Sequence, residues 1–338
     1  MTTVIKNLRL AAYHKFNYAV IESWGVFPFR SHPEFAWKKE KKPIEEFIAL
    51  RDAADECGIK IIPQFNIFGH ASMSRDVSCK HAILDENPEL APLFEPAGWS
   101  FCLSSPATRR VVTDLVLELY DFYRRPAFFH LGCDEAYDFQ TCADCAAQDS
   151  IALAGGYILY FHDLFAALGT RTIIWHDMLF DRKDPRWKDC VVVGDERTAT
   201  LVDILPKDLI LADWQYSPAP KGNPDHEWPT SLYLQEKGFD VAVCPWMDTQ
   251  GMLDLCKMAV RRNLFGMIET TWHTAFNAPY YAMLTEAAIC AWLGSRPENY
   301  PDRGIMAHHS RQVSQDMGGL TEYADFGNSD RQVFQDQA

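Results

Sequence analysis

The sequence predicts an α/β protein with a TIM-type (β/α)8 barrel that is one strand short. Short apolar runs of strand length alternate with longer segments of helical periodicity, which is the order of a parallel sheet with crossover helices. The runs are apolar at consecutive positions, as expected for strands that are covered on both faces. The chain has 338 residues, of which 48% are hydrophobic, and this is long enough for one barrel-sized domain.

The predicted elements have recognisable ends. Gly58 and Gly169 stop their helices just before the next strand, and Pro106 begins a helix after Ser104 and Ser105, which suit its cap. The predicted strands are Tyr18–Trp24, Ile59–Asn66, Ala127–Asp134, Thr172–His176, Leu209–Trp214, Val241–Trp246 and Gly266–Trp272, and the predicted helices are Val4–Phe16, Pro43–Gly58, Pro106–Arg124 and Ile151–Gly169.

Seven strands are predicted where a complete barrel has eight. Either Val191–Val193 supplies the eighth strand, or the first strand is absent, because the chain begins directly on a helix. A barrel without its first strand exposes two sheet edges, which proteins usually cover by association, so a homodimer is a reasonable hypothesis. Residues 1–295 are assigned to the barrel, and residues 296–338 to a polar C-terminal tail that is partly helical.

Charge and composition exclude several classes of function. The 46 acidic and 32 basic residues give a formal net charge of −14, which repels phosphate backbones, so no nucleic-acid partner is expected. No segment approaches the ~20 uninterrupted apolar residues of a membrane span, and the N-terminus lacks a signal-peptide pattern. We therefore expect a cytoplasmic protein without a membrane partner. The ten cysteines follow no secreted disulfide pattern, as in a reducing compartment.

One cysteine pair has the CxxC spacing of a metal knuckle. Cys142 and Cys145 follow Cys133 closely, with Asp144 and His130 nearby in the sequence. A structural zinc site usually needs a second ligand pair at a defined spacing, and the sequence shows none. Free thiols, or occasionally a redox pair, are therefore expected here, and no metal.

Candidate site residues stand at the carboxyl ends of the predicted strands, because barrel enzymes place their catalytic groups there. Tryptophans and carboxylates recur at these ends. A sugar suits this combination, since its C–H faces stack on indole rings while its hydroxyls donate to carboxylates. The alternative is that the tryptophans only pack in the core. The candidates are Glu22, Trp24, Gln64, Asn66, His70, His130, Asp134, Glu135, Trp175, His176, Asp177, Asp213, Trp214, Tyr216, Trp246, Asp248, Glu269, Trp272 and His273.

The sharpest signal is the segment FFHLGCDEAYDF, in which an apolar strand runs into the adjacent carboxylates Asp134 and Glu135. Neighbouring residues of an extended strand point to opposite sides, so the two side chains are expected to have different roles. A carboxyl group beside aromatic rings and a second carboxylate favours its neutral form, as a general acid requires. The alternative is that the pair caps the next helix.

The same segment resembles the strand-four signature His-x-Gly-x-Asp-Glu of glycoside hydrolase family 20, the β-N-acetylhexosaminidases. Two other segments, IIPQFNIFGH and IIWHDM, resemble the family's motifs at strands three and five. The segments VIESWGVFPF and DWQY, together with Gln64 in place of the usual Glu, are most similar to the hexosaminidase D branch. The resemblance runs from about residue 4 to 295. The residues that match the signature are His130, Gly132, Asp134 and Glu135.

The resemblance implies an exo-acting β-N-acetylhexosaminidase that needs no cofactor and acts on a terminal N-acetylgalactosamine or N-acetylglucosamine of a small carbohydrate or glycoconjugate. Glu135 would be the general acid and then the base, and Asp134 would orient the substrate's own 2-acetamido group, which is the nucleophile in this family. Tyr216 would donate to the acetamide oxygen. The other substrate-binding residues would be Glu22, His70, His130, Trp175, Asp177, Trp214, Trp246 and Trp272.

Two departures from the family pattern keep alternatives open. The family's first strand carries an Arg that binds sugar hydroxyls, which the start of this chain does not supply, and His273 follows Trp272 where many members have Glu. Glu269 or Asp248 would then bind those hydroxyls. The alternatives are a barrel glycosidase for a sugar without the acetamido group, with Glu22 or Glu269 as its second carboxylate, and a catalytically degenerate sugar-binding protein.

Overall fold

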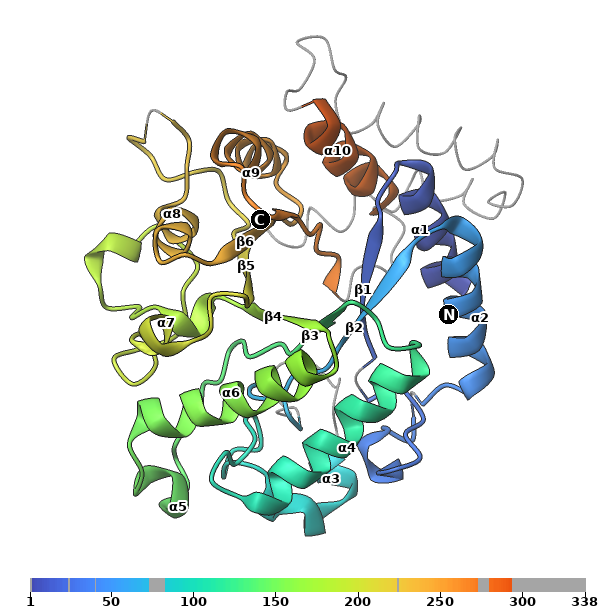
Figure 1. Ribbon diagram of the computed structural model, residues 1–338, viewed down its shortest axis with the longest axis vertical. Coiled ribbons are helices and arrows are strands. Elements are labelled where there is room, and N and C mark those ends of the chain that lie inside the picture. Colours follow the sequence, from blue (N-terminus) through green and yellow to red (C-terminus); the bar gives the residue numbers. More distant parts are fainter. Residues whose placement is uncertain are drawn as a thin grey trace, which may run out of the picture.

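The centre of the molecule is a curled sheet of seven parallel strands. The strands lie in chain order, β1-β2-β3-β4-β5-β6-β7, and each pairs with its neighbours in parallel. Helices cover the outer face of the sheet (Figure 1). The protein therefore has the incomplete TIM-type barrel that the sequence predicts. The computed structural model describes residues 2–23, 25–39, 41–72, 83–223, 225–272 and 280–293.

Each of the seven predicted strands and four predicted helices is found, most of them shorter than predicted and some shifted by one or two residues. The strands are β1 (Tyr18–Glu22), β2 (Lys60–Gln64), β3 (Phe128–His130), β4 (Arg171–Trp175), β5 (Ile210–Trp214), β6 (Asp240–Cys244) and β7 (Gly266–Met267). The helices are α1 (Thr2–Tyr13), α2 (Ile44–Cys57), α3 (Ile83–Glu86), α4 (Pro106–Phe122), α5 (Ala143–Ala146), α6 (Ser150–Ala167), α7 (Leu201–Ile204), α8 (Pro229–Glu236), α9 (Thr249–Arg262) and α10 (Tyr280–Leu293). Short 3₁₀ turns are η1 (Pro33–Phe35), η2 (Pro88–Leu93), η3 (Asp177–Leu179) and η4 (Pro185–Trp187).

Local chemistry explains where the helices begin and end. Pro106 occupies the first turn of α4, and the hydroxyl of Ser105 accepts the backbone N–H of Thr108 at 3.3 Å, as an N-cap does. Gly58 ends α2 in the left-handed conformation, with φ of 73°, which a residue without Cβ adopts at little cost. The helix ends that the sequence predicts at these residues are confirmed.

Successive side chains of a strand point alternately into two different cores, which explains why the strands are apolar at consecutive positions. In β4, Ile174 belongs to the outer core between sheet and helices, whereas Ile173 and Trp175 belong to the core inside the curled sheet. In β5, Leu211 faces outward, whereas Trp214 faces inward. The last inward-facing residues of β4 and β5 are therefore tryptophans, and both indoles lie at the carboxyl end of the sheet.

The helix α6 is apolar enough to need its own account. By length and composition it alone among the described helices could cross a membrane, with a mean hydropathy of 1.2 over 18 residues. Much of it is instead buried in the fold, where Tyr157, Phe161 and Phe165 pack in the outer core. Packing against the sheet therefore accounts for its apolar character.

Some predictions on the strands are wrong or untested. Val191–Val193 forms no strand and pairs with none of the described strands, so it does not supply the eighth strand. The predicted strand Ala127–Asp134 ends already at His130. Trp24, His273 and the tail at 296–338 lie outside the described residues.

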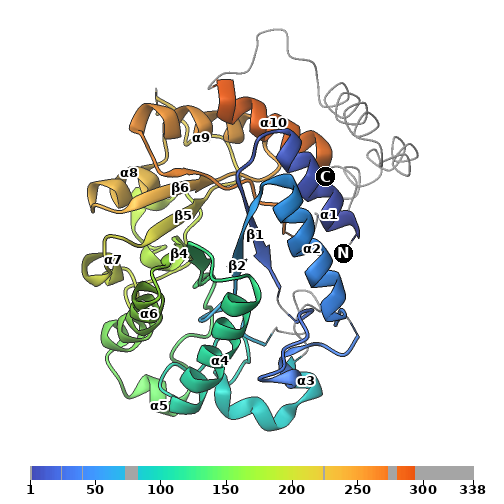
Figure 2. The same ribbon diagram turned by 45° about the vertical axis from the view of Figure 1, so that its right-hand side comes forward.

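The first and last described helices, α1 and α10, pack together beside the sheet edge (Figure 2). Trp292 of α10 donates its indole N–H to the carbonyl of His14, just after α1, at 3.0 Å, and Thr285 lies 2.9 Å from His14 Nε2. Leu10 and Leu284 form a small apolar cluster between the two helices. The packing of α1 on α10 thus joins the helices at the β1 and β7 sides of the sheet, although these two strands do not pair with each other.

Candidate active site

The predicted site residues of the first three strands lie in one row at the carboxyl end of the sheet. Glu22 is in register with Gln64, and Gln64 is in register with His130. The amide of Gln64 donates to Glu22 Oε1 at 3.0 Å and lies 3.5 Å from Asn66 Oδ1. Parallel pairing in order along the chain therefore brings residues that are more than a hundred positions apart to a common edge.

The loop after β3 turns sharply and carries the two carboxylates. Gly132, Cys133 and Glu135 all have positive φ, at 68°, 74° and 48°. A Cβ at position 132 would lie 1.4 Å from Asn66 Oδ1, so only glycine fits there. The prediction that Asp134 and Glu135 point to opposite sides of a strand is wrong, because the strand ends before them and the loop turns both toward His70. The alternative of a helix cap fails for the same reason.

His70 joins the two carboxylates. Its Nε2 lies 3.2 Å from Asp134 Oδ2 and 2.9 Å from Glu135 Oε2. Burial opposes the charged imidazole, but the two carboxylates outweigh it and raise the pKa of His70 to about 10. The three side chains could also face one metal ion, since their ligand atoms lie within 4.8 Å of one another. An imidazole that holds both protons at neutral pH is a poor ligand, so an ion pair describes this group better.

The two carboxylate oxygens of Asp134 have different surroundings. Its Oδ2 faces His70, whereas its Oδ1 is buried and has no hydrogen-bond partner among the described residues. A buried carboxylate oxygen without a donor is costly unless a ligand or a water supplies one. The arrangement therefore leaves one buried acceptor that an N–H or O–H group of a ligand could satisfy.

Two aromatic residues that the sequence analysis did not select hold Glu135. The hydroxyl of Tyr137 donates to Glu135 Oε1 at 2.6 Å, and the indole N–H of Trp99 donates to the Glu135 carbonyl at 2.5 Å. Trp99 also packs on His70, with ring centroids 4.6 Å apart. Tyr137 lies in the quoted motif two residues after Glu135 and could have been noticed. Trp99 lies in a long loop, at no strand end, and carries no such signal.

Asp177 connects the loop after β3 that carries Asp134 and Glu135, here called the carboxylate loop, to the aromatic residues at the strand ends. Its Oδ2 accepts the backbone N–H of Glu135 at 2.9 Å, and its Oδ1 accepts the indole N–H of Trp214 at 3.2 Å. Burial raises the pKa of Asp177 to about 7, with a further contribution from the Asp134 carboxylate. Asp177 therefore has a structural part here, since it supports the turn that presents Glu135.

The predicted aromatic residues form one cluster, here called the aromatic cluster. Trp175 contacts Trp272 at 5.4 Å between ring centroids, and Tyr216 contacts Trp214 at 5.1 Å and Trp246 at 5.2 Å. The indole N–H of Trp175 is buried without a partner among the described residues. The field of Asp134 adds to the burial that raises the pKa of Tyr216, which places the two in the same neighbourhood.

His130 lies beneath this cluster as a neutral ring. It packs against Trp175 in a tilted arrangement with ring centroids 4.4 Å apart, and its Nδ1 accepts the backbone N–H of Gly132 at 3.0 Å. Burial lowers the pKa of His130 to about 3, so the imidazole stays uncharged at neutral pH. Its role in this geometry is to position the turn after β3 and the Trp175 indole.

Two carboxylates suggested as sugar ligands are engaged elsewhere. Asp248 caps α9, because its Oδ1 accepts the backbone N–H of Gly251 at 2.6 Å. Both carboxylate oxygens of Glu269 are buried, and burial together with Cys290 and Glu286 raises the pKa of Glu269 well above its usual value. Neither carboxylate is presented to a substrate in this conformation.

The sequence also predicts that indoles wall a pocket. The rings of the aromatic cluster touch one another, and two surface hollows of about 410 and 430 Å³ lie elsewhere, beside Arg109 and beside Asn223. The walled pocket stays a prediction. What the described residues do show is a continuous set of contacts from His70 through the two carboxylates and Asp177 to the indoles.

Comparisons with known proteins point the same way. Residues 44–223, more than half of the chain, match the sequence profile described as "Glycosyl hydrolase family 20, catalytic domain". No match is found among curated proteins.

Solved structures share the fold. A chitobiase from Flavobacterium johnsoniae has a TM-score of 0.62 at 17% identity, over 96% of this chain and 50% of that one. A β-N-acetylhexosaminidase from Bacteroides fragilis has a TM-score of 0.65 at 17% identity, over 94% and 68%. An exo-β-N-acetylglucosaminidase from Vibrio harveyi has a TM-score of 0.61 at 15% identity, over 94% and 55%. The chain thus spans half to about two thirds of the length of these proteins.

Proposed function

The chain belongs to glycosyl hydrolase family 20, and from this premise we propose that it is an exo-acting β-N-acetylhexosaminidase that retains anomeric configuration by substrate assistance. Its substrate would be a carbohydrate or glycoconjugate with a terminal N-acetylgalactosamine or N-acetylglucosamine. The observation that carries the proposal is Asp134 Oδ1 beside Glu135, which is buried and has no hydrogen-bond partner in the part of the chain that the structure describes.

Glu135 would serve as general acid and then as general base. In the first step Glu135 gives its proton to the glycosidic oxygen as the bond to the leaving group breaks. In the second step it takes a proton from the water that attacks the anomeric carbon.

The nucleophile would be the carbonyl oxygen of the substrate's acetamido group. Asp134 Oδ1 would accept the acetamido N–H, which turns the carbonyl oxygen toward the anomeric carbon and stabilises the positive charge of the oxazolinium ring. The hydroxyl of Tyr216 would donate to that same oxygen and hold its direction. Adjacent residues of one turn suit these two roles better than a nucleophile and an acid on opposite faces of a sugar.

The alternative hypothesis, a glycosidase for a sugar without an acetamido group, needs Glu22 or Glu269 as a second catalytic carboxylate, and both are engaged elsewhere or buried. Glu269 is buried away from solvent, and Glu22 already accepts from Gln64 at 3.0 Å. The alternative hypothesis of a sugar-binding protein without activity does not explain the setting of Glu135. Binding alone does not require a carboxylate held between a charged imidazole and a phenol.

The test is an assay of the full chain with aryl N-acetyl-β-glucosaminide and N-acetyl-β-galactosaminide. Glu135→Gln should lower kcat by about two to four orders of magnitude, a typical general-acid contribution. Glu236→Gln, on the exposed side of α8, is the matched control and should retain full activity. Turnover unchanged in Glu135→Gln would remove Glu135 from the mechanism.

An N-acetylglucosamine thiazoline inhibitor distinguishes substrate-assisted hydrolysis from a glycosidase that acts on sugars without an acetamido group, since it mimics the oxazolinium intermediate. Tight binding to the wild type that weakens in Asp134→Asn is expected. Absence of inhibition together with hydrolysis of aryl glycosides that lack the acetamido group would favour the other glycosidase. The resemblance to the hexosaminidase D branch suggests faster turnover of the galactosaminide, and the ratio of the two kcat/KM values decides it.

A further inference from the structure

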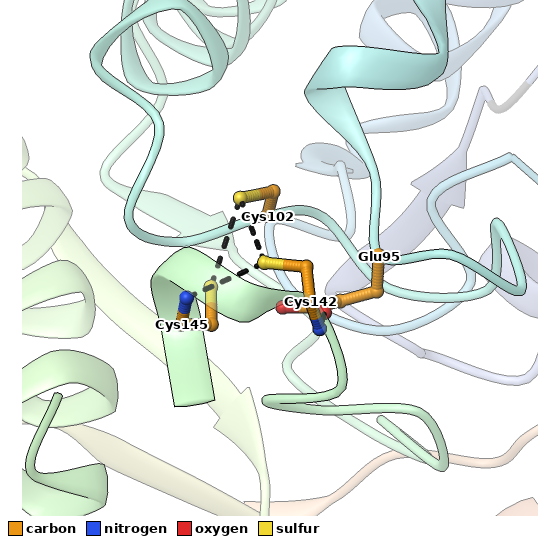
Figure 3. A group of neighbouring side chains, drawn as sticks. All are labelled: Glu95, Cys102, Cys142 and Cys145. Atoms are coloured by element: carbon orange, nitrogen blue, oxygen red, sulfur yellow. Dashed lines mark hydrogen bonds between the residues drawn. The ribbon is translucent and has the colours of Figure 1, made fainter. Parts of the chain in front are cut away.

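Three cysteines and a glutamate from distant parts of the sequence meet next to the carboxylate loop. Figure 3 shows Glu95, Cys102, Cys142 and Cys145 gathered around one point. Cys102 Sγ is 3.6 Å from both Cys142 Sγ and Cys145 Sγ, and one ligand atom from each residue lies within 4.8 Å of the others. Cys142 is partly exposed and the other three side chains are buried.

These distances match a shared metal ion better than a disulfide. A disulfide holds its sulfurs about 2.05 Å apart. Ligands of a tetrahedral zinc with Zn–S bonds of about 2.3 Å are separated by about 3.8 Å. The 3.6 Å separations from Cys102 to Cys142 and to Cys145 are within a few tenths of an ångström of that value. The sulfurs of Cys142 and Cys145 lie within 4.8 Å of each other, so this pair would close by at most about 1 Å to accept a central ion.

The backbone arranges the ligands as two pairs. Phe94 and Phe101 form an antiparallel bridge, which brings the flanking Glu95 and Cys102 to the same side of a small hairpin. The second pair is the CxxC turn that begins α5, in which the backbone N–H of Cys145 donates to Cys142 Sγ at 3.3 Å. Such N–H···S bonds stabilise a thiolate. The hairpin thus supplies the second ligand pair that the sequence does not reveal.

Glu95 provides an independent sign of a ligand. Its Oε2 accepts the backbone N–H groups of Cys142, at 2.6 Å, and Thr141, at 3.0 Å. Its Oε1 is buried and has no hydrogen-bond partner among the described residues, although the side chain is only 1% exposed. Buried carboxylate oxygens are normally satisfied, so this one calls for a cation or a donor at the cysteines.

We propose that Glu95, Cys102, Cys142 and Cys145 bind one Zn²⁺ ion as a structural site. All four positions are filled by protein groups, which is typical of structural rather than catalytic zinc. Binding would convert the three thiols to thiolates and release their protons to solvent. The hydroxyl of Ser104 lies 3.2 Å from the sulfurs of both Cys102 and Cys145, where it can donate to a ligand thiolate.

The ion would join the two segments that flank Glu135. The hairpin that carries Glu95 and Cys102 also carries Trp99, whose indole contacts the Glu135 carbonyl. The backbone N–H of Trp99 donates to Asp138, in the same loop as the CxxC turn, at 3.2 Å. Zinc would therefore hold the loop after β2 against the loop after β3. This proposal is independent of the substrate, because it concerns the chain's own folding.

Metal content of the full chain tests the proposal. Protein purified without chelator and under reducing conditions should contain about one zinc per chain by elemental mass spectrometry. The double variant Cys142→Ser, Cys145→Ser should lose that zinc, and Glu95→Gln should bind it more weakly. Cys57→Ser is the matched control, since this cysteine lies at the end of α2 outside the cluster, and it should retain full metal content.

Cobalt substitution of the wild type gives a readout that needs no variant. Co²⁺ at this site should show tetrahedral d–d bands and a thiolate-to-metal charge-transfer band, which an ion at His70, Asp134 and Glu135 cannot produce. Chelator removal of the metal should lower Tm. The proposal is overturned if the wild type neither contains nor takes up zinc, if Co²⁺ binds without the charge-transfer band, or if intact mass and peptide mapping show Cys102 in a disulfide.

Discussion

The indole N–H of Trp272 donates to the hydroxyl oxygen of Tyr216 at 2.8 Å. Because the oxygen accepts this bond, the hydroxyl proton of Tyr216 is left to donate in another direction. Trp272 itself has positive φ, at 42°, so the chain after β7 turns sharply to place its indole there. The pair thus orients a phenol as a donor within the aromatic cluster, next to the field of Asp134.

Tyr216→Phe is expected to lower kcat on N-acetyl substrates by about 10²- to 10³-fold, the usual loss for one donor to a developing charge. The phenyl ring keeps its contacts with Trp214 and Trp246, whereas the Trp272 indole loses its acceptor, so stability should fall by about 1 kcal/mol. Steady-state kinetics with both aryl substrates measure the effect, and the exposed Tyr13→Phe serves as control. An unchanged kcat would mean that the acetamide oxygen has another donor.

The stability that His70 contributes should depend on pH. Its pKa is raised from 6.5 to about 10 by the two carboxylates, so its contribution is complete below about pH 6.5 and is lost as pH rises through about 10. His70→Asn should therefore lower the free energy of unfolding more at pH 6 than at pH 9.5. Urea denaturation at these pH values gives the comparison.

The control for this pH series is His226→Asn, because the side chain of His226 is 63% exposed. It should show a small effect at both pH values. If His70→Asn lowers the free energy of unfolding by the same amount at pH 6 and at pH 9.5, the ion pair with Asp134 and Glu135 is contradicted.

Asp213 and His176 form a fully buried ion pair behind the aromatic cluster. Their Oδ1 and Nε2 atoms are 3.0 Å apart, and Thr230 and Ser231 donate to the other oxygen of Asp213. Despite burial, His176 and these donors hold the pKa of Asp213 below its usual value. Asp213→Asn should cost about 3–5 kcal/mol of unfolding free energy, since it leaves a buried charge without its partner.

The comparison for that variant is Asp203→Asn, which removes an exposed salt bridge to Lys237. It should cost much less than Asp213→Asn, because solvent screens exposed pairs. Chemical denaturation at pH 7 measures both. Equal costs would show that His176 is neutral and that the pair is an ordinary hydrogen bond.

Glu269→Met should stabilise the protein. The carboxyl of Glu269 is buried without a hydrogen-bond partner among the described residues, and its pKa is raised well above its usual value. A raised carboxyl pKa means that folding stability falls as pH rises above the unfolded value of about 4.3. The gain should therefore be larger at pH 8 than at pH 5, by thermal unfolding. A loss at both pH values would reveal a partner for this carboxylate.

The periodicity of the sequence was sufficient for the sheet. Ile173, Ile174 and Trp175 are apolar in a row because one core lies inside the curled sheet and another outside it, and this is a local, repeated signal. The carboxyl ends of such strands meet by construction, so the grouping of His130, Trp175 and Trp214 could be predicted without coordinates. Two exposed sheet edges, and with them the homodimer, remain a prediction.

The directions of the loop residues could not be predicted. Asp134 and Glu135 converge on His70 because three residues between 132 and 135 have positive φ, and such turns depend on the surroundings that enforce them. Asp248 and Glu269 were plausible sugar ligands by position, but a helix cap and burial occupy them. A strand end specifies where a side chain starts and not where it points.

By itself the sequence determined the order of strands and helices, the edge of the sheet at which the candidate site residues gather, and the family signature, because all of these are encoded in short segments. Only the tertiary structure decided which side chains touch. Cys102 and Glu95 reach the Cys142–Cys145 turn, and Trp99 reaches Glu135, across some 35 to 50 positions of chain. Contacts at that separation come from loop packing, which leaves no periodic trace in the sequence.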